Sequence, residues 1–548
     1  MVTFFKVSEE HFIVVDSNKN FPAKDLEKLS WLFGNAKLFD ATSLDGNFVG
    51  PRKEMITPWS TNAVEITQNM GIEGITRIEE YFKVETENPE YDPMLQSVYQ
   101  NPGQDIFLID KKPEDIIYVN NISEYNVKEG LALSEDEIQY LESLSTKLNR
   151  KLTDSEVFGF SQVNSEHCRH KIFNGKFIID GKEKESSLFS LIKKTTKNHL
   201  NKVVSAYKDN CSFAGGPVIE QFAPGRQDKA DFFITRDIES ILSLKAETHN
   251  FPTTVEPFNG ASTGTGGEIR DRIAGGKGAI PMAGTAVYMT SYPRTDETHE
   301  WEKHTEPRPW LYQTPSEILI KASNGASDFG NKFGQPLING SLLTFEHANE
   351  LKKFGFDKVI MLAGGIGYGK KKDTQKDTPE KGDLIIMMGG DNYRIGMGGG
   401  AVSSVATGEY DNTIELNAVQ RANPEMQKRV YNAIRAMSES DNNKIVSIHD
   451  HGAGGHLNCF SELVEETGGN IDIRKLPIGD PTLSAKEIVG NESQERMGLV
   501  LKKSSLDELM KIADRERAPL YVVGEITGDH VFTFTDSNSG KKPIDLEI

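Results

Sequence analysis

The sequence predicts a mixed α/β protein, of the α+β class, built from several domains. Short apolar runs typical of strands, such as FIVV at 12–15, alternate with helical stretches such as AKDLEKLSWLFG. The length of 548 residues is enough for three or four domains with cores of their own. A polar, turn-rich segment, KKKDTQKDTPEKGD at 370–383, separates two regions in which strands and helices alternate.

Four consecutive segments follow from these patterns. Residues 1–125 mix strand and helix runs and predict a compact α+β module. Residues 126–176 predict a helical linker, in which Thr153 and Glu156 have the spacing of a capping box before an apolar run. Residues 177–372 alternate strands, helices and glycine loops, and end on the apolar KVIMLAGGIGYG. Residues 373–548 begin a second α/β domain with LIIMMGG.

Composition narrows the class of protein. The formal net charge of −19 argues against a nucleic-acid partner, because no bulk positive field is present to release counterions. The three cysteines, Cys168, Cys211 and Cys459, form no CxxC pair, which predicts a reduced, cytoplasmic setting. No window of 18 apolar residues and no signal-peptide pattern is present, so we expect neither a membrane span nor secretion.

The stretch KAETH, 245–249, carries the first chemical signal. If it is a strand, Lys245, Glu247 and His249 share one face, while Ala246 and Thr248 lie on the other. A cation, a carboxylate and an imidazole in a row suit a reactive site better than a core. The competing interpretation is an exposed edge strand with a solvated polar side.

A glycine-rich stretch, GASTGTGGEIRD, follows it and predicts a loop. Gly260, Gly264, Gly266 and Gly267 would leave backbone N–H groups free to wrap an anion. Glu247 before the loop and Asp271 after it can hold Mg²⁺, and Lys245 and Arg270 can neutralise phosphate. Together these groups predict a phosphoryl-transfer site, where catalysis is mainly positioning and charge stabilisation. The alternative is a simple structural turn.

Further stretches offer groups of the same kind. In IVSIHDHGAGG, Asp450 ends an apolar run before glycines, either as a ligand or as a buried cap on the next helix. The glycines of 389–404 fit an anion cradle or a turn. GNESQERMG offers Glu492, Ser493 and Gln494, as groups for sugar hydroxyls or as a surface turn.

In NSEHCRHKIF, a helix continuing from Val157 would place His167 on the stripe of Val157, Phe160 and Asn164. His167 is then either a hydrogen-bonded interface residue or an acid/base group. A Cys168–histidine nucleophile pair and a zinc site at His167 and His170 are both disfavoured, because adjacent helical residues diverge and no further ligands are evident.

Four of these stretches, in this order, carry a family resemblance. NSEHCRHKIF, KAETHNFPTTVEPFNGASTGTGGEIRD, IHDHGAGG and NESQERM resemble phosphoribosylformylglycinamidine synthase of the long, single-chain type, and GPRKEMITPWSTNA resembles its N-terminal domain. The resemblance implies a ligase of purine biosynthesis that uses ATP and Mg²⁺. The enzyme activates the formamide oxygen of formylglycinamide ribonucleotide as an iminophosphate, from which ammonia displaces phosphate. It also implies a ferredoxin-like first module, the linker, and one half of an aminoimidazole-ribonucleotide-synthetase architecture made of the last two segments.

The resemblance assigns roles by position. His249 and His167 would be catalytic. Lys245, His170, Gly260, Gly264, Gly266, Gly267 and Asp271 would bind ATP. Thr248, Asn250, Phe251, Arg270, Gln420, Glu492, Ser493 and Gln494 would line the substrate site. Glu247, Asp271 and Asp450 would be magnesium ligands.

Two departures from the family pattern shape the expectation. Phe251 stands where shorter relatives carry a histidine. A second synthetase half and a Cys-His-Glu glutaminase do not follow, so we expect a fragment of a longer polypeptide. Such a fragment cannot make ammonia from glutamine and turns over ATP poorly. It can pair as a homodimer in which the second copy takes the place of the missing half. The competing functions are another ATP-dependent member of the superfamily, such as aminoimidazole ribonucleotide synthetase, a thiamine-monophosphate kinase or selenophosphate synthetase, and a non-catalytic nucleotide-binding scaffold that docks a glutaminase. The N-terminal extension and NSEHCRHK argue against the first group, and the Lys245–Glu247–His249 face argues against a scaffold.

Overall fold

The computed structural model describes residues 1–86, 89–92, 95–164, 170–295, 298–303, 312–349, 351–394, 396–398, 419–492 and 495–548, and gives backbone only at Pro58, His170 and Trp301. The chain divides into two compact units. One comprises residues 1–114 with 478–483, and the other comprises residues 115–477 with 484–548. Both mix helices and sheets, which confirms the predicted mixed α/β class.

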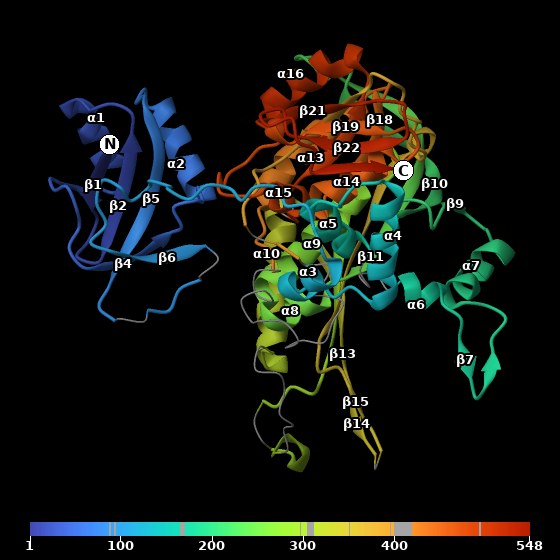
Figure 1. Ribbon diagram of the computed structural model, residues 1–548. Helices are drawn as coiled ribbons and strands as arrows, with labels where there is room; N and C mark the ends of the chain where they lie inside the picture. Colours follow the sequence, from blue (N-terminus) through green and yellow to red (C-terminus); the bar gives the residue numbers. More distant parts are fainter. Residues whose placement is uncertain are drawn as a thin grey trace. The chain divides into compact units, whose positions relative to one another are not determined.

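The first unit is a six-stranded sheet with two helices (Figure 1). The strands lie in the order β3-β1-β2-β5-β4-β6, and every neighbouring pair is antiparallel. From β2 to β5 the chain runs β-α-β-β-α-β, the order expected of a ferredoxin-like module. The elements are β1 (Val2–Lys6), β2 (His11–Ser17), α1 (Ala23–Leu32), β3 (Lys37–Phe39), β4 (Asn47–Pro51), α2 (Pro58–Asn69), β5 (Ile75–Val84) and β6 (Gln96–Gln100).

The side chains of strand β2 pack into cores on both faces of this sheet. Its side chains alternate, so Ile13 and Val15 pack with Leu29 of α1 in one core. Phe12 and Val14 pack in a second core on the opposite face. A strand covered on both sides is apolar at every position rather than at every second one, and this is why FIVV is a continuous apolar run.

The linker is helical, as predicted. It contains α3 (Ile122–Glu129), α4 (Glu135–Lys147), α5 (Asp154–Val163) and α6 (His170–Asn174). The Thr153–Glu156 capping box is confirmed, with both reciprocal hydrogen bonds present. Helix α5 ends at Val163 with Asn164 as its C-cap, so the helix does not continue to His167 on the stripe of Val157 and Phe160, and that expectation is wrong. His167 itself lies outside the described residues.

The region after the linker forms a sheet in the order β13-β12-β16-β11-β10-β9, with β12 and β13 parallel and the other neighbouring pairs antiparallel. Helix α7 buries none of its residues, and Figure 1 shows it with β7 and β8 extending away from this sheet. The elements are β7 (Ile178–Ile179), β8 (Lys182–Glu183), α7 (Leu188–Asn198), β9 (Val203–Ser205), β10 (Ser212–Pro224), β11 (Phe233–Thr248), α8 (Asn250–Val255), α9 (Pro257–Ala274), β12 (Ile280–Thr290), α10 (Pro315–Phe333), β13 (Leu337–Thr344), β14 (Glu346–Ala348), β15 (Lys353–Gly355) and β16 (Ile360–Lys370).

The last region forms a seven-stranded sheet in the order β18-β20-β17-β21-β19-β22-β23. Its neighbouring strands are antiparallel except for β19 and β22, which are parallel. The elements are β17 (Leu384–Met388), α13 (Pro424–Glu439), β18 (Ile445–Asp450), α14 (Gly455–Val464), β19 (Gly469–Asp472), α15 (Ala485–Gly490), β20 (Met497–Leu501), α16 (Leu506–Glu516), β21 (Leu520–Ile526), β22 (Val531–Thr535) and β23 (Ile544–Glu547).

One hydrophobic core joins the two larger sheets. It combines Ile269 of α9 and Phe329 of α10 with Ile434 of α13, Leu509 of α16 and Leu499 of β20. Helices α9 and α10 contact α13, so two helical layers lie between the sheets. Helix α9 also contacts β11 of one sheet and β18 of the other. A residue on α9 can therefore meet side chains from both sheets.

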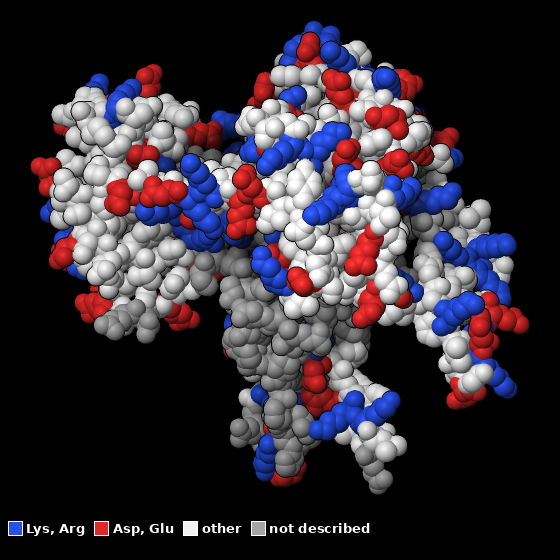
Figure 2. Space-filling view, viewed as in Figure 1, with Lys and Arg blue, Asp and Glu red and all other residues white. Residues whose placement is uncertain are grey.

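Charged side chains are spread over the surface. Figure 2 shows lysine, arginine, aspartate and glutamate interspersed on the face in view, without a continuous basic surface. Among the described residues, none of the helices is both long and apolar enough to cross a membrane.

Candidate functional site

The glycine-rich segment 260–271 is a helix, and the predicted loop is wrong. It forms most of α9 (Pro257–Ala274), whose residues are almost all buried. Glycine inside a helix costs about 1 kcal/mol relative to alanine, so local propensity favoured a loop. Packing between two sheets outweighs that propensity, because Ile269 and Ile273 on this helix belong to the shared core.

Three of the four glycines permit close packing of α9. A Cβ atom on Gly260 would lie 2.4 Å from the carbonyl carbon of Pro252. On Gly264 it would lie 2.8 Å from Cβ of His249, and on Gly266 2.7 Å from Cζ of Phe329. Gly267 differs, because a Cβ atom there would lie 3.7 Å from its nearest neighbour, Nη2 of Arg270, which is an ordinary van der Waals distance. Their predicted role in nucleotide binding stays a prediction, but it can no longer rest on an anion-wrapping loop.

Strand β11 places the first polar residues. Its alternation is as predicted for Lys245 and Glu247, whose side chains meet at 3.4 Å, Nζ to Oε2. The strand ends at Thr248, and His249 is the N-cap residue of α8, so His249 does not belong to the strand face as expected. Strand β11 pairs with β10 along one side and β16 along the other, which rules out an edge strand.

A cluster of carboxylates forms where β11, α9 and β18 meet. Nζ of Lys245 lies 2.9 Å from Oδ2 of Asp271 on α9. Nε of Arg270, also on α9, lies 3.9 Å from Oδ2 of Asp450 at the end of β18. The amide of Asn210 joins the two aspartates, because its Nδ2 donates to Oδ1 of Asp271 at 3.2 Å and to Oδ1 of Asp450 at 2.8 Å. The structure thus brings together five of the sequence-predicted residues.

Burial and mutual repulsion alter the protonation of this cluster. Burial, then the neighbouring Glu247 carboxylate, raises the pKa of Asp271 to about 7, against the opposing effect of Lys245. Burial and the charge of Asp271 raise the pKa of Asp450 to about 6. For Lys245, burial acts to lower the pKa, but the carboxylates of Asp271 and Glu247 outweigh it and the pKa is raised. The carboxylates therefore repel each other in a site from which water is largely excluded, and an added cation would relieve that repulsion.

Arg270 is the buried cation of the cluster, with 1% of its surface exposed. Its Nη1 donates to Oε1 of Gln427 at 2.9 Å. Its Nε has no hydrogen-bond partner among the described residues. A buried guanidinium with an unused donor is costly unless a ligand supplies an acceptor, so Arg270 is suited to an anionic or carbonyl oxygen.

The remaining predicted substrate residues form a second group. A Cβ on Gly396 would lie 2.8 Å from Cγ of Gln420 and 3.3 Å from the carbonyl carbon of Glu492, so these two residues flank one turn. Both are buried, which excludes a surface turn at Glu492. Oε1 of Glu492 accepts from the backbone N–H of Gly454 at 3.1 Å, in the turn that follows Asp450. Gly454, rather than Asp450, is the N-cap of α14. Ser493 and Gln494 lie outside the described residues.

Three predicted substrate residues lie next to His249 in the chain, and two of them have structural contacts. Oδ1 of Asn250 accepts from the backbone N–H of Met361 at 3.1 Å. Phe251 is buried with 3% exposure, and Nζ of Lys358 lies 5.3 Å from its ring centroid. Thr248 is exposed on the sheet face opposite Lys245. Their contacts with substrate stay predictions.

Sequence reasoning missed three residues of the site. Asn210 lies between β9 and β10, in a polar run without periodicity. Gln427 lies on α13. Glu495 is buried with a φ of 69°, and burial raises its pKa to about 7 despite Arg270 and the backbone N–H of Asn423. Only the positive φ of a non-glycine residue marks Glu495 as unusual, and that is visible only in the structure.

The oxygen donors fit a hard divalent cation in chemical type but are separated by nitrogen donors. Within the described part of the chain, no group of three or more histidine, cysteine, aspartate or glutamate residues is arranged to hold a metal ion. The reason is local, because Lys245 and Asn210 each place a nitrogen between carboxylates that Mg²⁺ would otherwise bridge. The donor set fits Mg²⁺, provided that these nitrogens move.

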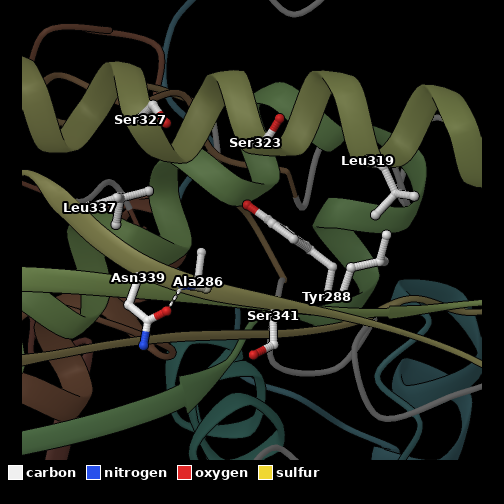
Figure 3. A pocket seen from close by; sticks show the side chains of 10 residues that line it. Ala286, Tyr288, Leu319, Ser323, Ser327, Leu337, Asn339 and Ser341 are labelled. Carbon is white, nitrogen blue, oxygen red and sulfur yellow. Dashed lines mark hydrogen bonds between the residues drawn. The ribbon is translucent and has the colours of Figure 1, made fainter.

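A separate pocket of ≈ 400 Å³ lies between α10 and strands β12 and β13 (Figure 3). Its lining includes Leu319, Ser323, Tyr288 and Asn339. None of the predicted site residues lines it.

Comparison with known proteins first defines a class. Residues 380–537 match the family described as AIR synthase related protein, C-terminal domain. Two further segments narrow the class to a family. Residues 10–105 match the formylglycinamide ribonucleotide amidotransferase N-terminal family, and residues 122–171 match the linker domain of the same enzyme. Over these three segments the chain is similar to formylglycinamide ribonucleotide amidotransferases and to AIR synthase related proteins.

Solved structures support the fold. PurL of Thermotoga maritima complexed with FGAR is 23% identical, with a TM-score of 0.53, and the match covers 75% of this chain and 55% of that one. PurLQS of the same organism is 22% identical, with a TM-score of 0.50, covering 75% of this chain and 54% of the other. The chain thus spans little more than half the length of these relatives.

Proposed function

We propose that this chain carries the part of a phosphoribosylformylglycinamidine synthase that binds formylglycinamide ribonucleotide beside Mg²⁺–ATP. The reaction transfers the γ-phosphoryl group of ATP to the formamide oxygen, and ammonia then displaces phosphate to give the amidine. The observation that carries this proposal is the cluster of Lys245, Glu247, Arg270, Asp271 and Asp450 where β11, α9 and β18 meet. The similarity of residues 10–105 and 122–171 to formylglycinamide ribonucleotide amidotransferase domains supports the same reaction.

The cationic and the anionic residues of the cluster have different proposed roles. Lys245 and Arg270 neutralise phosphoryl oxygens, since both are buried or half-buried cations beside the cluster. Glu247, Asp271 and Asp450 would hold Mg²⁺, which supplies charge neutralisation at the phosphates. Gly260, Gly264, Gly266 and Gly267 give α9 its course past the nucleotide, and His170 adds a further ATP contact.

The substrate side is formed by residues around His249 and the Gly396 turn. His249, held against α9 at Gly264, moves the proton at the formamide, with His167 as the second catalytic histidine. Arg270 directs its unused Nε to the substrate, together with Thr248, Asn250, Phe251, Gln420, Glu492, Ser493 and Gln494. Ammonia comes from a glutaminase.

An exposed apolar pair on one sheet face indicates where a partner of this chain would bind. Leu244 of β11 and Ile366 of β16 oppose each other in register and are 42% and 37% exposed. Apolar pairs of this kind favour a covering surface. We infer that a second synthetase half, or a second copy of the chain, covers this face, and that the protein works in the cytoplasm. Sedimentation of the chain, and of a Leu244→Glu variant, tests self-association at this face.

Calorimetric titration with formylglycinamide ribonucleotide, with and without Mg²⁺–ATP, tests the function directly. Saturable binding that the Arg270→Ala variant loses would support the substrate site. The matched control is Arg226→Ala, because Arg226 is an exposed arginine paired with Asp228 at 2.9 Å. Binding of ADP by a folded chain that has no affinity for the ribonucleotide would contradict the proposal and favour the scaffold.

A further inference from the structure

Asn210 links both aspartates of the cluster. Its Nδ2 donates to Asp271 at 3.2 Å and to Asp450 at 2.8 Å. A single donor shared by two carboxylates lies where a bridging cation would lie. The two aspartates come from α9 and β18, so this amide is also a tie between the two sheets.

The loop that carries Asn210 is held firmly by its neighbour Asp209. Oδ1 of Asp209 lies 2.6 Å from Nζ of Lys376, and Oδ2 accepts from the backbone N–H of Gly276 at 2.7 Å. Asn210 therefore reaches the cluster from a fixed backbone. Its Oδ1 faces away, 3.4 Å from Nζ of Lys376.

An asparagine side chain presents a donor and an acceptor on the same carbon, and rotation about its last torsion exchanges them. Amide oxygens are regular ligands of hard divalent cations. The exchange leaves Lys376 paired with Asp209. It breaks the long contact of Oδ1 with Lys376 and the two hydrogen bonds of Nδ2 to the aspartates, so it is favourable only when a cation takes the place of the NH₂ group between them. Arg270 gives independent evidence that a ligand enters here, since it is 99% buried and its unpartnered Nε lies 3.9 Å from Asp450 among the described residues.

We propose that Asn210 is a ligand of the divalent cation, holding Asp271 and Asp450 together through its NH₂ group when the cation is absent and turning its Oδ1 to the cation when it binds. The proposal rests on the cation site of the proposed function and adds a neutral fourth donor to Glu247, Asp271 and Asp450.

The test is a Mn²⁺ titration of the whole chain, followed by the electron paramagnetic resonance signal of free Mn²⁺. We expect Asn210→Ala to weaken the affinity by about tenfold or more. Asn210→Asp should bind Mn²⁺ at least as tightly as the wild type, because it supplies an oxygen in the same place. The control is Asn432→Ala, which removes an amide bonded to Glu516 at 3.1 Å, outside the cluster, and should leave the affinity unchanged.

The Asn210→Asp variant distinguishes a metal-ligand role of Asn210 from a purely structural role. A carboxylate cannot donate to two other carboxylates, so a purely structural Asn210 predicts that Asn210→Asp loses as much affinity as Asn210→Ala. That result, or wild-type affinity in Asn210→Ala, would overturn the proposal. Circular dichroism melting of each variant shows that the compared chains are folded. If instead the wild type binds no Mn²⁺, or Asp450→Asn binds as tightly as the wild type, the cation site of the proposed function is itself wrong.

Discussion

Arg270 of α9 and Asp450 of β18 lie 3.9 Å apart, Nε to Oδ2, and this pair joins the helix of one sheet to the end of a strand in the other. Both side chains are buried. Removing one member of such a pair leaves an uncompensated charge, which costs more than the pair contributes. The same guanidinium also influences the protonation of Glu495.

Glu495 should make the stability of the chain depend on pH. Burial raises its pKa from 4.5 to about 7 in the folded state, so its contribution is fully present below about pH 4.5 and is lost as the pH rises through about 7. The loss is a few kcal/mol, at about 1.4 kcal/mol for each pKa unit. Urea unfolding at pH 5 and pH 8 should show a smaller decrease for Glu495→Gln than for the wild type. An identical decrease in both chains would contradict this, and Glu425→Gln, at an exposed carboxylate, is the control.

Two glycines of α9 should respond in opposite directions to alanine. Gly260→Ala places Cβ 2.4 Å from backbone atoms that cannot move aside, so we expect a loss of about 2–3 kcal/mol. Gly267→Ala meets nothing closer than 3.7 Å and removes a glycine from a helix, so we expect a gain of about 0.5–1 kcal/mol. Chemical denaturation measures both. Destabilisation by Gly267→Ala would argue against a helix at this point.

Glu156 should hold the linker to the C-terminal strand. Its carboxylate pairs with Arg150 at 2.7 Å and accepts from the backbone N–H groups of Thr153 and Asp545, both at 3.0 Å. Glu156→Ala removes the acceptor of both backbone N–H groups and leaves Arg150 with backbone carbonyls alone, so we expect a loss of about 3 kcal/mol. Thermal unfolding and limited proteolysis check it. Glu142→Ala, at an exposed position of α4, should change the stability by less than about 0.5 kcal/mol.

Lys370 should act as a cap on α13. Its Nζ donates to the carbonyl oxygens of Glu439 at 2.9 Å and Ser440 at 2.6 Å, at the negative end of the helix. Lys370→Met should cost about 1–2 kcal/mol, because the partly buried carbonyl of Ser440 loses this donor, while that of Glu439 keeps only the hydrogen bond from Nε2 of Gln221 at 2.8 Å. Its neighbour offers the control, since Lys371 pairs with Glu239 at 2.9 Å on the surface and Lys371→Met should be nearly neutral. Equal effects of the two substitutions, read from urea midpoints, would rule out a capping role.

Local sequence patterns correctly predicted those features that depend on residues close together in the sequence. The capping box at Thr153 and Glu156 and the alternation of Lys245 and Glu247 both follow from fixed spacings. The prediction of a loop within 257–274 was wrong because glycine-rich sequences are typical of loops. Only the position of this segment between two sheets makes a helix favourable. Asn210 could not have been found, because it reaches Asp450 across 240 positions of the chain.

The sequence by itself determined the mixed α/β class, the helical linker, and the charged residue types that form the cluster of β11, α9 and β18. These follow from periodicity, capping and charge, which act over a few residues. The tertiary structure alone decided that Asp271 and Asp450 meet, that Lys245 and Asn210 separate the carboxylates, and that the glycines form a packed helix. These contacts depend on burial between sheets that are distant in sequence, where desolvation rather than local propensity sets the free energy.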